Sequence, residues 1–518
     1  MIKKRLVWII PILIVVALFG LQYVNQLQDE IKLPDQGWSR TIHIPVQAGL
    51  GKSFAYEDSA GLHLYTYKGS SITHTELTKN LKVKARQTKR FKGDIMRIVG
   101  GQGNQFIFKK DFNLYFYQNG TTRLLAKKVD FTAYEKNDVF YTKGRTLYQT
   151  NLHTLKSNVL SVFPKEISTL SINETGDLLL ITTNDEENHQ ESFYVHNVKK
   201  PGPPHEFANL YLGSSRISFV ELGRFRDQLG VLYSLQTSKG ALVPYYFQVP
   251  ESQALKGKPM DMDEKPLDIY FTGASFPINT LRDVFFTIRD QKPTVLFTTE
   301  GQRTMRQTSE NVYEAQPNAQ GRWIAERRST SPETSSTPFW IGAKNIVWYD
   351  YKKGDDVYQM GVASQNPTLI KKSQEIRAED LSLALSDATL SLTRVLILIL
   401  LSVLFSVGGL LVYGLTLFAK VELIDNNSRV LRWITMGAFV LGEYLLTLIV
   451  MNPKFAFYAP KYLTFPMSGL VYTLVMAGIS WLLTQWLKTK QWGFILEVAY
   501  FATLFLLMFN FLFGPYYF

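Results

Sequence analysis

Residues 395–418 read VLILILLSVLFSVGGLLVYGLTLF, twenty-four consecutive residues without a charged side chain. A helix rises about 1.5 Å per residue, so this stretch is long enough to cross a hydrocarbon core about 30 Å thick with some tilt. It separates a long polar, aromatic-rich region from a C-terminal part that holds three more apolar stretches. The sequence therefore predicts a large domain joined to a helical membrane block.

Five stretches are apolar enough to be transmembrane helices: Leu6–Val24, Val395–Phe418, Val430–Met451, Tyr462–Leu487 and Phe494–Phe513. The loop cations divide unequally between the two sides of a five-span arrangement. One side holds Lys3, Lys4, Arg5, Lys420, Arg429, Arg432, Lys488 and Lys490, and the other holds Lys454 and Lys461. Because cytoplasmic loops are enriched in Lys and Arg, we predict a multi-pass protein of the cell membrane with a cytoplasmic N-terminus and an extracytoplasmic C-terminus.

The first apolar stretch is compatible with a cleaved signal peptide or a retained anchor, since both begin with basic residues and an apolar core. The stretch is long for a signal core, and Gln22–Gln28 lacks a small-x-small cleavage pattern, although a cut after Gly20 stays an alternative. We favour a membrane anchor over residues 1–28, which places residues 29–394 outside the cytoplasm.

Residues 29–370 are predicted to form an all-β domain, because apolar residues alternate with polar ones and turn residues are frequent. An apolar-aromatic pair recurs along this region at intervals of 33 to 52 residues, close to the length of a four-stranded propeller blade. The pairs, expected on matching strands, are Leu64-Tyr65, Leu114-Tyr115, Leu147-Tyr148, Phe193-Tyr194, Tyr245-Tyr246, Leu296-Phe297 and Val347-Trp348. We therefore predict a β-propeller of about six to seven blades, with an irregular β-sandwich or two smaller β domains as the alternatives.

Two stretches, Leu170–Leu180 and Ala315–Ala325, each place a polar turn ending in Gly176 or Gly321 between two apolar strands. Glycine supplies the positive φ that such a turn needs. Both stretches resemble the "Ser-Pro-Asp-Gly, then apolar strand" turn of WD40-like β-propeller repeat proteins. The resemblance concerns the fold of residues 50–360 alone, because Asn173 and Asn318 stand near the family's Asp position and no Trp-Asp dipeptide closes a blade.

Residues 371–394 are predicted to form a stalk helix that continues into the span at Val395. Leu381, Leu385, Ala388 and Leu392 recur at helical spacing and are expected to form one apolar stripe. Acidic residues come early and Arg394 comes last, as the helix dipole favours. Such a helix could transmit movement of the domain or be a passive spacer.

Two carboxylates in the predicted spans are candidates for intramembrane function. Glu443 lies near the middle of its span, where a charge costs about 2.5 kcal/mol or more, so its side chain should face the bundle interior. Proton or ion coupling and a neutral packing role both fit Glu443. Glu497 lies about one turn inside the predicted cytoplasmic boundary, where its side chain can extend toward water. Close helix contacts are expected at the small residues Gly408, Gly409, Gly437, Ala438, Gly442, Gly469 and Gly478.

A basic stretch near the start of the β region is the candidate binding site of the predicted domain. It contains Lys79, Lys82, Lys84, Arg86, Lys89, Arg90 and Lys92 without an acidic residue. The functional interpretation is a site for a polyanion, either lipid headgroups or an anionic envelope polymer. The structural interpretation is an edge strand whose charges prevent aggregation.

Enzymatic chemistry has little support in the sequence. Cysteine is absent, which excludes disulfides, thiolate metal sites and a catalytic thiol. The common nucleophile, phosphate-binding and zinc-protease motifs are also absent, so we assign no catalytic, metal or cofactor-binding residues and leave any cofactor unknown. The acidic stretch 261–264 is interpreted as a solvated loop rather than a calcium site.

Three classes of function remain. The first is an extracytoplasmic module that binds or senses a cell-envelope component or a partner protein, with the helices as its anchor. The second is an accessory or permease-like subunit of a transport system, and the third is an envelope hydrolase or lyase. The net charge of +12 is modest for 518 residues, so we expect the lipid bilayer and an envelope partner rather than nucleic acid. The composition also suits a bacterial envelope.

Overall fold

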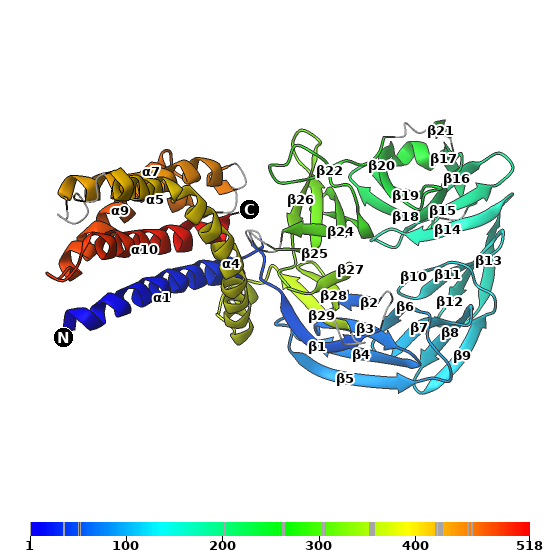
Figure 1. The fold of residues 1–518 in the computed structure, drawn as a ribbon. Coiled ribbons are helices and arrows are strands. Elements are labelled where there is room, and N and C mark those ends of the chain that lie inside the picture. The colour runs from blue at the N-terminus through cyan, green and yellow to red at the C-terminus, as the bar shows by residue number, and fades with distance from the viewer. Residues whose placement is uncertain are drawn as a thin grey trace. The chain divides into compact units, whose positions relative to one another are not determined.

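The computed structural model describes residues 2–34, 37–49, 51, 53–200, 202–257, 259–261, 265–302, 304, 307–351, 358–419, 422, 428–452, 455–456 and 459–517. The chain forms two compact units. One is helical and comprises Met1–Lys32, Thr304–Arg306 and Ile376–Phe518, and the other is the β unit, Leu33–Arg303 and Gln307–Glu375 (Figure 1).

The β unit contains seven sheets, which we number as blades from the first complete one. Blade I consists of β2 (Phe54–Glu57), β3 (Leu62–Lys68), β4 (Ser71–Leu77) and β5 (Val83–Arg90). Blade II consists of β6 (Arg97–Gln102), β7 (Gln105–Lys110), β8 (Asn113–Gln118) and β9 (Thr121–Ala126). Blade III consists of β10 (Thr132–Glu135), β11 (Asp138–Lys143), β12 (Thr146–Asn151) and β13 (Ser157–Val162).

The remaining blades follow in chain order. Blade IV consists of β14 (Glu166–Ile172), β15 (Leu178–Asp185), β16 (Gln190–Asn197) and β17 (His205–Tyr211). Blade V has β18 (Arg216–Phe225), β19 (Gln228–Gln236) and β20 (Leu242–Pro250). Blade VI has β23 (Arg282–Arg289), β24 (Lys292–Gln302), β25 (Thr308–Pro317) and β26 (Trp323–Arg327). Blade VII has β27 (Thr334–Ile341), β28 (Asn345–Tyr351), β29 (Tyr358–Ser364) and the N-terminal strand β1 (Ile42–Ala48).

The insertion after blade V supplies edge strands to its two neighbours. It begins with the short helix α2 (Glu251–Ala254) and contains β21 (Met260–Asp261) and β22 (Ile269–Phe271). β21 pairs in parallel with β17 of blade IV, and β22 pairs in parallel with β26 of blade VI. The insertion therefore covers the terminal strands of blades IV and VI, the two neighbours of the three-stranded blade V.

The seven blades form a closed ring. The first strand of each blade, from β2 through β6, β10, β14, β18 and β23 to β27, contacts the first strand of the next blade, and β27 contacts β2. The ring closes because β1 pairs antiparallel with β29, from Ile42 opposite Val362 to Ala48 opposite Tyr358. A seven-bladed β-propeller is therefore the fold of this unit, and the sandwich alternative is wrong.

Each blade carries one of the predicted apolar-aromatic pairs, which confirms the repeat. The prediction that the pairs occupy matching strands is wrong, because three lie on second strands (β3, β24 and β28) and four on third strands (β8, β12, β16 and β20). The two middle strands of a blade pack against neighbouring blades on both faces, so either can hold the pair. Leu64, Leu114, Leu147, Phe193, Leu296, Phe297, Val347 and Trp348 are all fully buried.

The two predicted glycine turns are hairpins of the propeller. Asn173 Oδ1 accepts hydrogen bonds from the backbone N–H groups of Asp177 and Leu178, both at 3.0 Å, in the β14–β15 turn. Asn318 Oδ1 accepts from Gln320 N and Arg322 N at 3.0 Å in the β25–β26 turn. Gly176 and Gly321 have φ of 69° and 77°, as predicted. Asparagine thus holds these turns with its own side chain.

Within the described residues, the helical unit contains five helical segments long and apolar enough to cross a membrane. Its helices are α1 (Ile2–Glu30), α4 (Ala378–Phe405), α5 (Val407–Ala419), α7 (Arg429–Val450), α9 (Ser468–Leu487) and α10 (Phe494–Phe513), with the short turns η1 (Lys461–Leu463) and η2 (Gly514–Tyr516). α1 packs against α4 and α10, so the N-terminal segment is part of the same unit as the C-terminal helices.

Two predicted spans differ in detail from the helices. The span over 395–418 is interrupted at Ser406, where α4 ends and α5 begins. Gly442 of α7 has no side chain there, and a Cβ at this position would lie 2.3 Å from the Phe405 carbonyl oxygen, so α7 contacts the backbone of this junction. The span predicted from Tyr462 becomes helix α9 only at Ser468, after η1 and after Met467, which has a φ of 62°.

The predicted stalk is split between two helices. α3 (Pro367–Ser373) belongs to the β unit, and α4 begins at Ala378 and runs on without a break through Val395. The predicted stripe lies on α4, but it is not one buried face, because Leu381 and Leu385 are exposed whereas Ala388 is buried. The buried residues of this part of α4 are small or polar: Asp380, Ala384, Asp387, Ala388 and Ser391. α4 packs against α1, whose own buried residues here are Gln22, Gln26 and Glu30, so this contact is polar.

Candidate functional site

The predicted basic stretch lies on the edge of blade I. Most of it forms β5, the terminal strand of its sheet, and all seven predicted cations are exposed. Lys82 precedes the strand and Lys92 follows it, so the charges extend along the whole edge. The structure therefore places these residues together on one open edge.

A groove beside this edge separates blade I from β1 of blade VII. It has a volume of about 670 Å³, and Arg86, Lys68, Ser71, Thr73 and Thr88 line it together with residues of β1 and Gln359. The Arg86 guanidinium donates a hydrogen bond to the Pro45 carbonyl, which holds the side chain in the groove. The site thus combines exposed cations with hydroxyl groups that can donate to an anion.

The positive charge continues beyond the predicted stretch into blades II and III. Residues 79–165 contain eighteen Lys and Arg against five Asp and Glu, whereas residues 166–370 contain twenty against twenty-five. The net charge of these segments is therefore +13 and −5. We call the exposed cations of residues 79–165 on these three blades, apart from Arg97 on the first strand β6, the basic sector: Lys79, Lys82, Lys84, Arg86, Lys89, Arg90, Lys92, Arg123, Lys127, Lys128, Lys136, Arg145 and Lys156.

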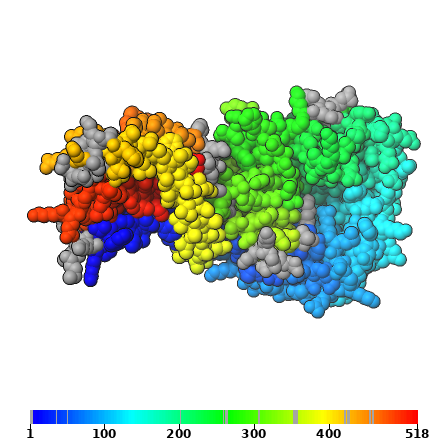
Figure 2. Space-filling view, in the orientation of Figure 1, coloured from blue at the N-terminus to red at the C-terminus, as the bar shows by residue number. Residues whose placement is uncertain are grey.

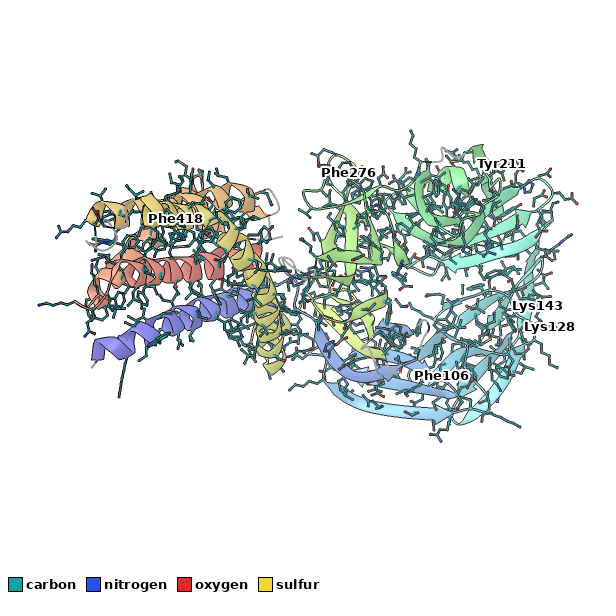
Figure 3. The ribbon with its side chains drawn as sticks, viewed as in Figure 1. Phe106, Lys128, Lys143, Tyr211, Phe276 and Phe418 are labelled. Carbon is teal, nitrogen blue, oxygen red and sulfur yellow. The ribbon has the colours of Figure 1, made fainter. Side chains whose placement is uncertain are left out.

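Chain topology brings the cations of successive blades to one margin. Lys127 and Lys128 follow β9 just as Lys92 follows β5, and Asp130 then contacts the β11–β12 turn by accepting a 2.7 Å hydrogen bond from Gly144 N. Figure 3 shows Lys128 and Lys143 on this margin of the propeller. In Figure 2, residues 79–165 form the light blue to cyan part of the surface.

Few acidic side chains neutralise the basic sector. Lys84 lies 3.7 Å from Glu76 and Lys136 lies 4.0 Å from Glu135. Within the described part of the chain, the other members have no carboxylate within 4.0 Å. Their charges therefore add to a positive field that attracts anions.

Glu443 occupies a closed polar cluster between three helices. Its carboxyl group is fully buried, and Oε2 lies 2.9 Å from Ser402 Oγ of α4. Ser402 Oγ also lies 3.1 Å from Asn510 Oδ1 of α10, and Ser406 Oγ lies 3.5 Å from Glu443 Oε1. Among the residues that the structure describes, no cationic side chain pairs with Glu443.

The hydrogen count of this cluster favours a neutral Glu443. Asn510 Nδ2 donates to the Leu506 carbonyl at 2.8 Å, so Oδ1 faces Ser402 as an acceptor. The single Ser402 proton cannot serve both Asn510 and an ionised Glu443. A protonated Glu443 resolves this, because it donates to Ser402, and Ser402 then donates to Asn510.

We expect Glu443→Gln to be tolerated, because the glutamine amide can donate to Ser402 as the protonated carboxyl group does. Glu443→Leu should lose these hydrogen bonds, at about 0.6 kcal/mol each on average in membranes. Membrane abundance and thermal unfolding in detergent measure both effects, and complementation of a deletion strain measures function. Loss of function in Glu443→Gln at normal abundance would show instead that Glu443 must ionise.

Glu497 is buried and paired, in contrast to the prediction that it reaches toward water. Its side chain is 1% exposed. Lys488 Nζ and Arg432 Nη1 donate to Oε2 at 2.6 and 2.8 Å, and Gln485 Nε2 donates to Oε1 at 2.8 Å. Glu497 therefore joins α7, the C-terminal end of α9 and α10, and among the described residues its hydrogen-bond partners differ from those of Glu443.

The predicted close contacts at glycine hold for part of the set. A Cβ at Gly409 would lie 2.6 Å from the Phe439 ring, and one at Gly469 would lie 2.8 Å from Met451 Sδ. A Cβ at Gly408, Gly437 or Gly478 would have no neighbour within 4 Å, so these three positions were predicted wrongly. The acidic stretch 261–264 lies outside the described residues except for Asp261.

The extension of the basic sector to blades II and III was missed by the sequence analysis. Lys127, Lys128, Arg145 and Lys156 stand in separate short loops, and no single window of the sequence is strongly basic around them. The excess of cations appears only when the charges are summed over the residues of a whole blade. Such a sum can be made only after the blade boundaries are known.

No family model and no curated protein matches this chain. A chain of the S. cerevisiae complex of Dbp5 with Nup159, Gle1, IP6 and ADP is 11% identical, with coverage of 63% of this chain and 94% of that chain and a TM-score of 0.39. The Neurospora crassa Pan2 WD40 domain is 9% identical (64% and 96% covered, TM-score 0.38), and the Toxoplasma gondii coronin WD40 domain is 12% identical (66% and 92% covered, TM-score 0.36). The seven sheets and their closure by an N-terminal strand make the β unit a WD40-like β-propeller in fold.

Proposed function

We propose that this chain is a multi-pass membrane protein whose extracytoplasmic propeller binds an anionic polymer of the cell envelope through the basic sector. The segregation of charge within the propeller carries this proposal. An edge strand needs a few charges to avoid aggregation, but it does not require an excess of thirteen cations over residues 79–165, which run from the end of blade I through blade III. A field of this size attracts a polyanion and raises its rate of association.

The curvature of the basic sector favours a polymer over a membrane surface. Most of the cations lie on or beside β5, β9 and β13, which are the terminal strands of three successive blades in a closed ring, and Lys136 and Arg145 lie in turns of blade III. A flat layer of headgroups touches a convex rim at one place, whereas a flexible chain can follow the rim and contact all three blades. The groove beside Arg86 gives such a chain a place to lie.

The helical unit serves as the anchor in this proposal. The polar cluster of Glu443 is closed by hydroxyl and amide groups, and Glu497 is neutralised by two cations, so both carboxylates have a structural role. These contacts support an anchor rather than a permease-like subunit.

The test is binding of a defined polyanion, such as a polyphosphate chain, to the full-length protein in detergent at low and high salt. We expect binding that weakens as salt screens the charges. Simultaneous change of Lys89, Lys92, Lys127 and Lys128 to Gln should weaken it by about fourfold to several hundredfold, at about 0.2–1 kcal/mol for each exposed charge.

The matched control changes four exposed lysines of the other blades, Lys199, Lys200, Lys239 and Lys256, to Gln. This control removes the same net charge but leaves the basic sector intact, so its affinity should stay within about twofold of wild type. Equal loss in both variants would point to unspecific attraction and would contradict the proposed site. Binding to anionic vesicles but not to the free polymer would favour lipid headgroups.

A further inference from the structure

Blade I contains a cluster of ionisable side chains that polyanion binding does not use. His63 of β3 pairs with Glu76 of β4 in the strand register, and His74 of β4 pairs with Tyr65 of β3. Because side chains alternate along a strand, the two histidines and Glu76 lie on the same face of the sheet. Both imidazoles are buried, each with 5% exposure.

The donor atoms of this cluster converge. His63 Nδ1 lies 3.0 Å from His74 Nε2, and the ligating atoms of His63, His74 and Glu76 all lie within 4.8 Å of one another. On the other side of the ring, His63 Nε2 lies 3.2 Å from Asp58 Oδ2. Asp58 lies within ion-pair distance of Nε2. A proton on Nε2 beside this carboxylate would leave the Nδ1 lone pair for an ion shared with His74 and Glu76.

Aromatic rings hold the two imidazoles in place. Tyr56 stacks on His63 with ring centroids 4.6 Å apart, and Tyr65 stacks on His74 at 4.4 Å. The turn at Gly103 of blade II fixes both tyrosines, because Tyr65 Oη donates to Gly103 O at 2.6 Å and Gly103 N donates to Tyr56 Oη at 2.8 Å. The orientation of the histidines is therefore set by two blades before any ligand binds.

We propose that His63 Nδ1, His74 Nε2 and the Glu76 carboxylate bind a divalent transition-metal ion such as zinc. Zinc binds histidine nitrogen and carboxylate oxygen at about 2.0–2.2 Å, and two histidines with one glutamate are an established ligand set that leaves a position for water. The two nitrogens are now 3.0 Å apart and face each other, so binding one ion would require them to separate by a few tenths of an ångström and both rings to turn toward the ion. Asp58 supplies the carboxylate–histidine–metal arrangement that orients a ligand ring.

An ion can reach this site from solvent. The side chains of Asp58 and Glu76 are 43% and 30% exposed, so the carboxylates lie at the surface and the imidazoles lie beneath them. Lys84 Nζ is 3.7 Å from Glu76 Oε2, which leaves the second carboxylate oxygen for the ion. The competing interpretation is a purely structural hydrogen-bond chain from Asp58 through His63 to His74.

The test is metal binding by the full-length protein, purified with an affinity tag that lacks histidine and stripped with a chelator. Zinc titrated against a chromophoric competitor should bind at one ion per chain, and cobalt at the same site should give visible absorption bands. Glu76→Gln and His74→Gln should weaken zinc binding at least tenfold, and Asp58→Asn should weaken it about 10- to 100-fold by releasing the His63 ring.

The control variant is His153→Gln, which removes an exposed histidine from a turn of blade III and should leave zinc binding unchanged. Glu76 and Asp58 are partly exposed, so their variants should fold even if His74→Gln does not. Circular dichroism of each variant checks this. Absence of a one-to-one zinc complex, or a complex that Glu76→Gln and Asp58→Asn leave unchanged, would overturn the proposal.

Discussion

Asp350→Ala should destabilise the propeller by about 3–5 kcal/mol, the range found when one partner of a buried charged network is removed. Asp350 is 1% exposed and accepts hydrogen bonds at 2.8 Å from Trp348 Nε1 and from Ser335 Oγ, both on Oδ1. Its Oδ2 lies 3.1 Å from His43 Nε2. Alanine would leave the fully buried Trp348 indole without its acceptor.

The position of Asp350 in the fold explains why the expected loss of stability is large. Ser335 lies on β27, Asp350 and Trp348 on β28, and His43 on β1, so a single carboxylate ties the N-terminal strand to the C-terminal blade. β1 is the strand that closes the ring of blades. A closed ring loses its cooperative packing when the closing strand detaches, so the effect should reach blades far from Asp350.

The measurement is the urea midpoint of the β-type circular dichroism signal of the full-length protein. Asp350→Asn should cost less, because its Oδ1 still accepts from Trp348 and Ser335, and Ser335→Ala should cost about 1 kcal/mol for one hydrogen bond. The matched control Asp268→Ala, at an exposed site, should lie within about 0.5 kcal/mol of wild type. An Asp350→Ala protein as stable as this control would contradict the assigned role of Asp350 in ring closure.

The blade repeat could be predicted from the sequence because every blade must bury its middle strands. Leu64-Tyr65 and Val347-Trp348 illustrate this, since each pair occupies a strand that is buried from both sides. The same argument cannot say which middle strand holds a pair, because second and third strands meet the same physical requirement. The ring closure by β1 could not be predicted either, since it joins residues more than 300 positions apart.

The failures in the helical unit have a different origin. Apolar residues at helical spacing, such as Leu381 and Leu385, usually mark the face of a helix that packs on a core in water. In the structure α4 packs against α1, and the buried residues in the first turns of α4 and the last turns of α1 are mostly polar or small, whereas the leucines are exposed. A hydrophobic pattern cannot reveal a polar contact between two helices that are nearly 350 residues apart in sequence.

His63 and His74 show the same limit within the propeller. They are eleven residues apart, which matches no common metal-binding spacing, and only the register of β3 with β4 brings them together. Register depends on the turn between the strands, here Gly69 with a φ of 54°. The candidate metal site of His63 and His74 can therefore be recognised only once the pairing of β3 with β4 is known.

The helical unit supports the proposed five-span topology through contacts that are independent of loop charge. At one end of the helices, Tyr500 near the start of α10 donates to the Val7 carbonyl near the start of α1 at 3.1 Å, and Arg432 and Lys488 both pair with Glu497. At the other end, Asn25 Nδ2 donates to the hydroxyl groups of Tyr462 and Tyr516 at 2.8 and 3.1 Å. The N-terminal ends of α1 and α10 therefore lie together, and so do their C-terminal ends. The two helices run parallel to each other.

A cytoplasm-dependent fluorescent reporter should therefore be dark when fused after Phe518 and bright when fused after Asn427. The end that contains Val7, Arg432, Lys488 and Glu497 carries the excess of cations, so the positive-inside rule places it in the cytoplasm. Tyr516 lies with Asn25 at the opposite end, so a C-terminal fusion must cross the membrane. A reporter that is active only after export, fused at the same two positions, is the matched control and should give the inverse pattern. Bright fluorescence after Phe518 would contradict both the five-span arrangement and the extracytoplasmic propeller. The reason is that the C-terminus lies at the same end of the helices as the C-terminal end of α1, from which the chain continues into the propeller.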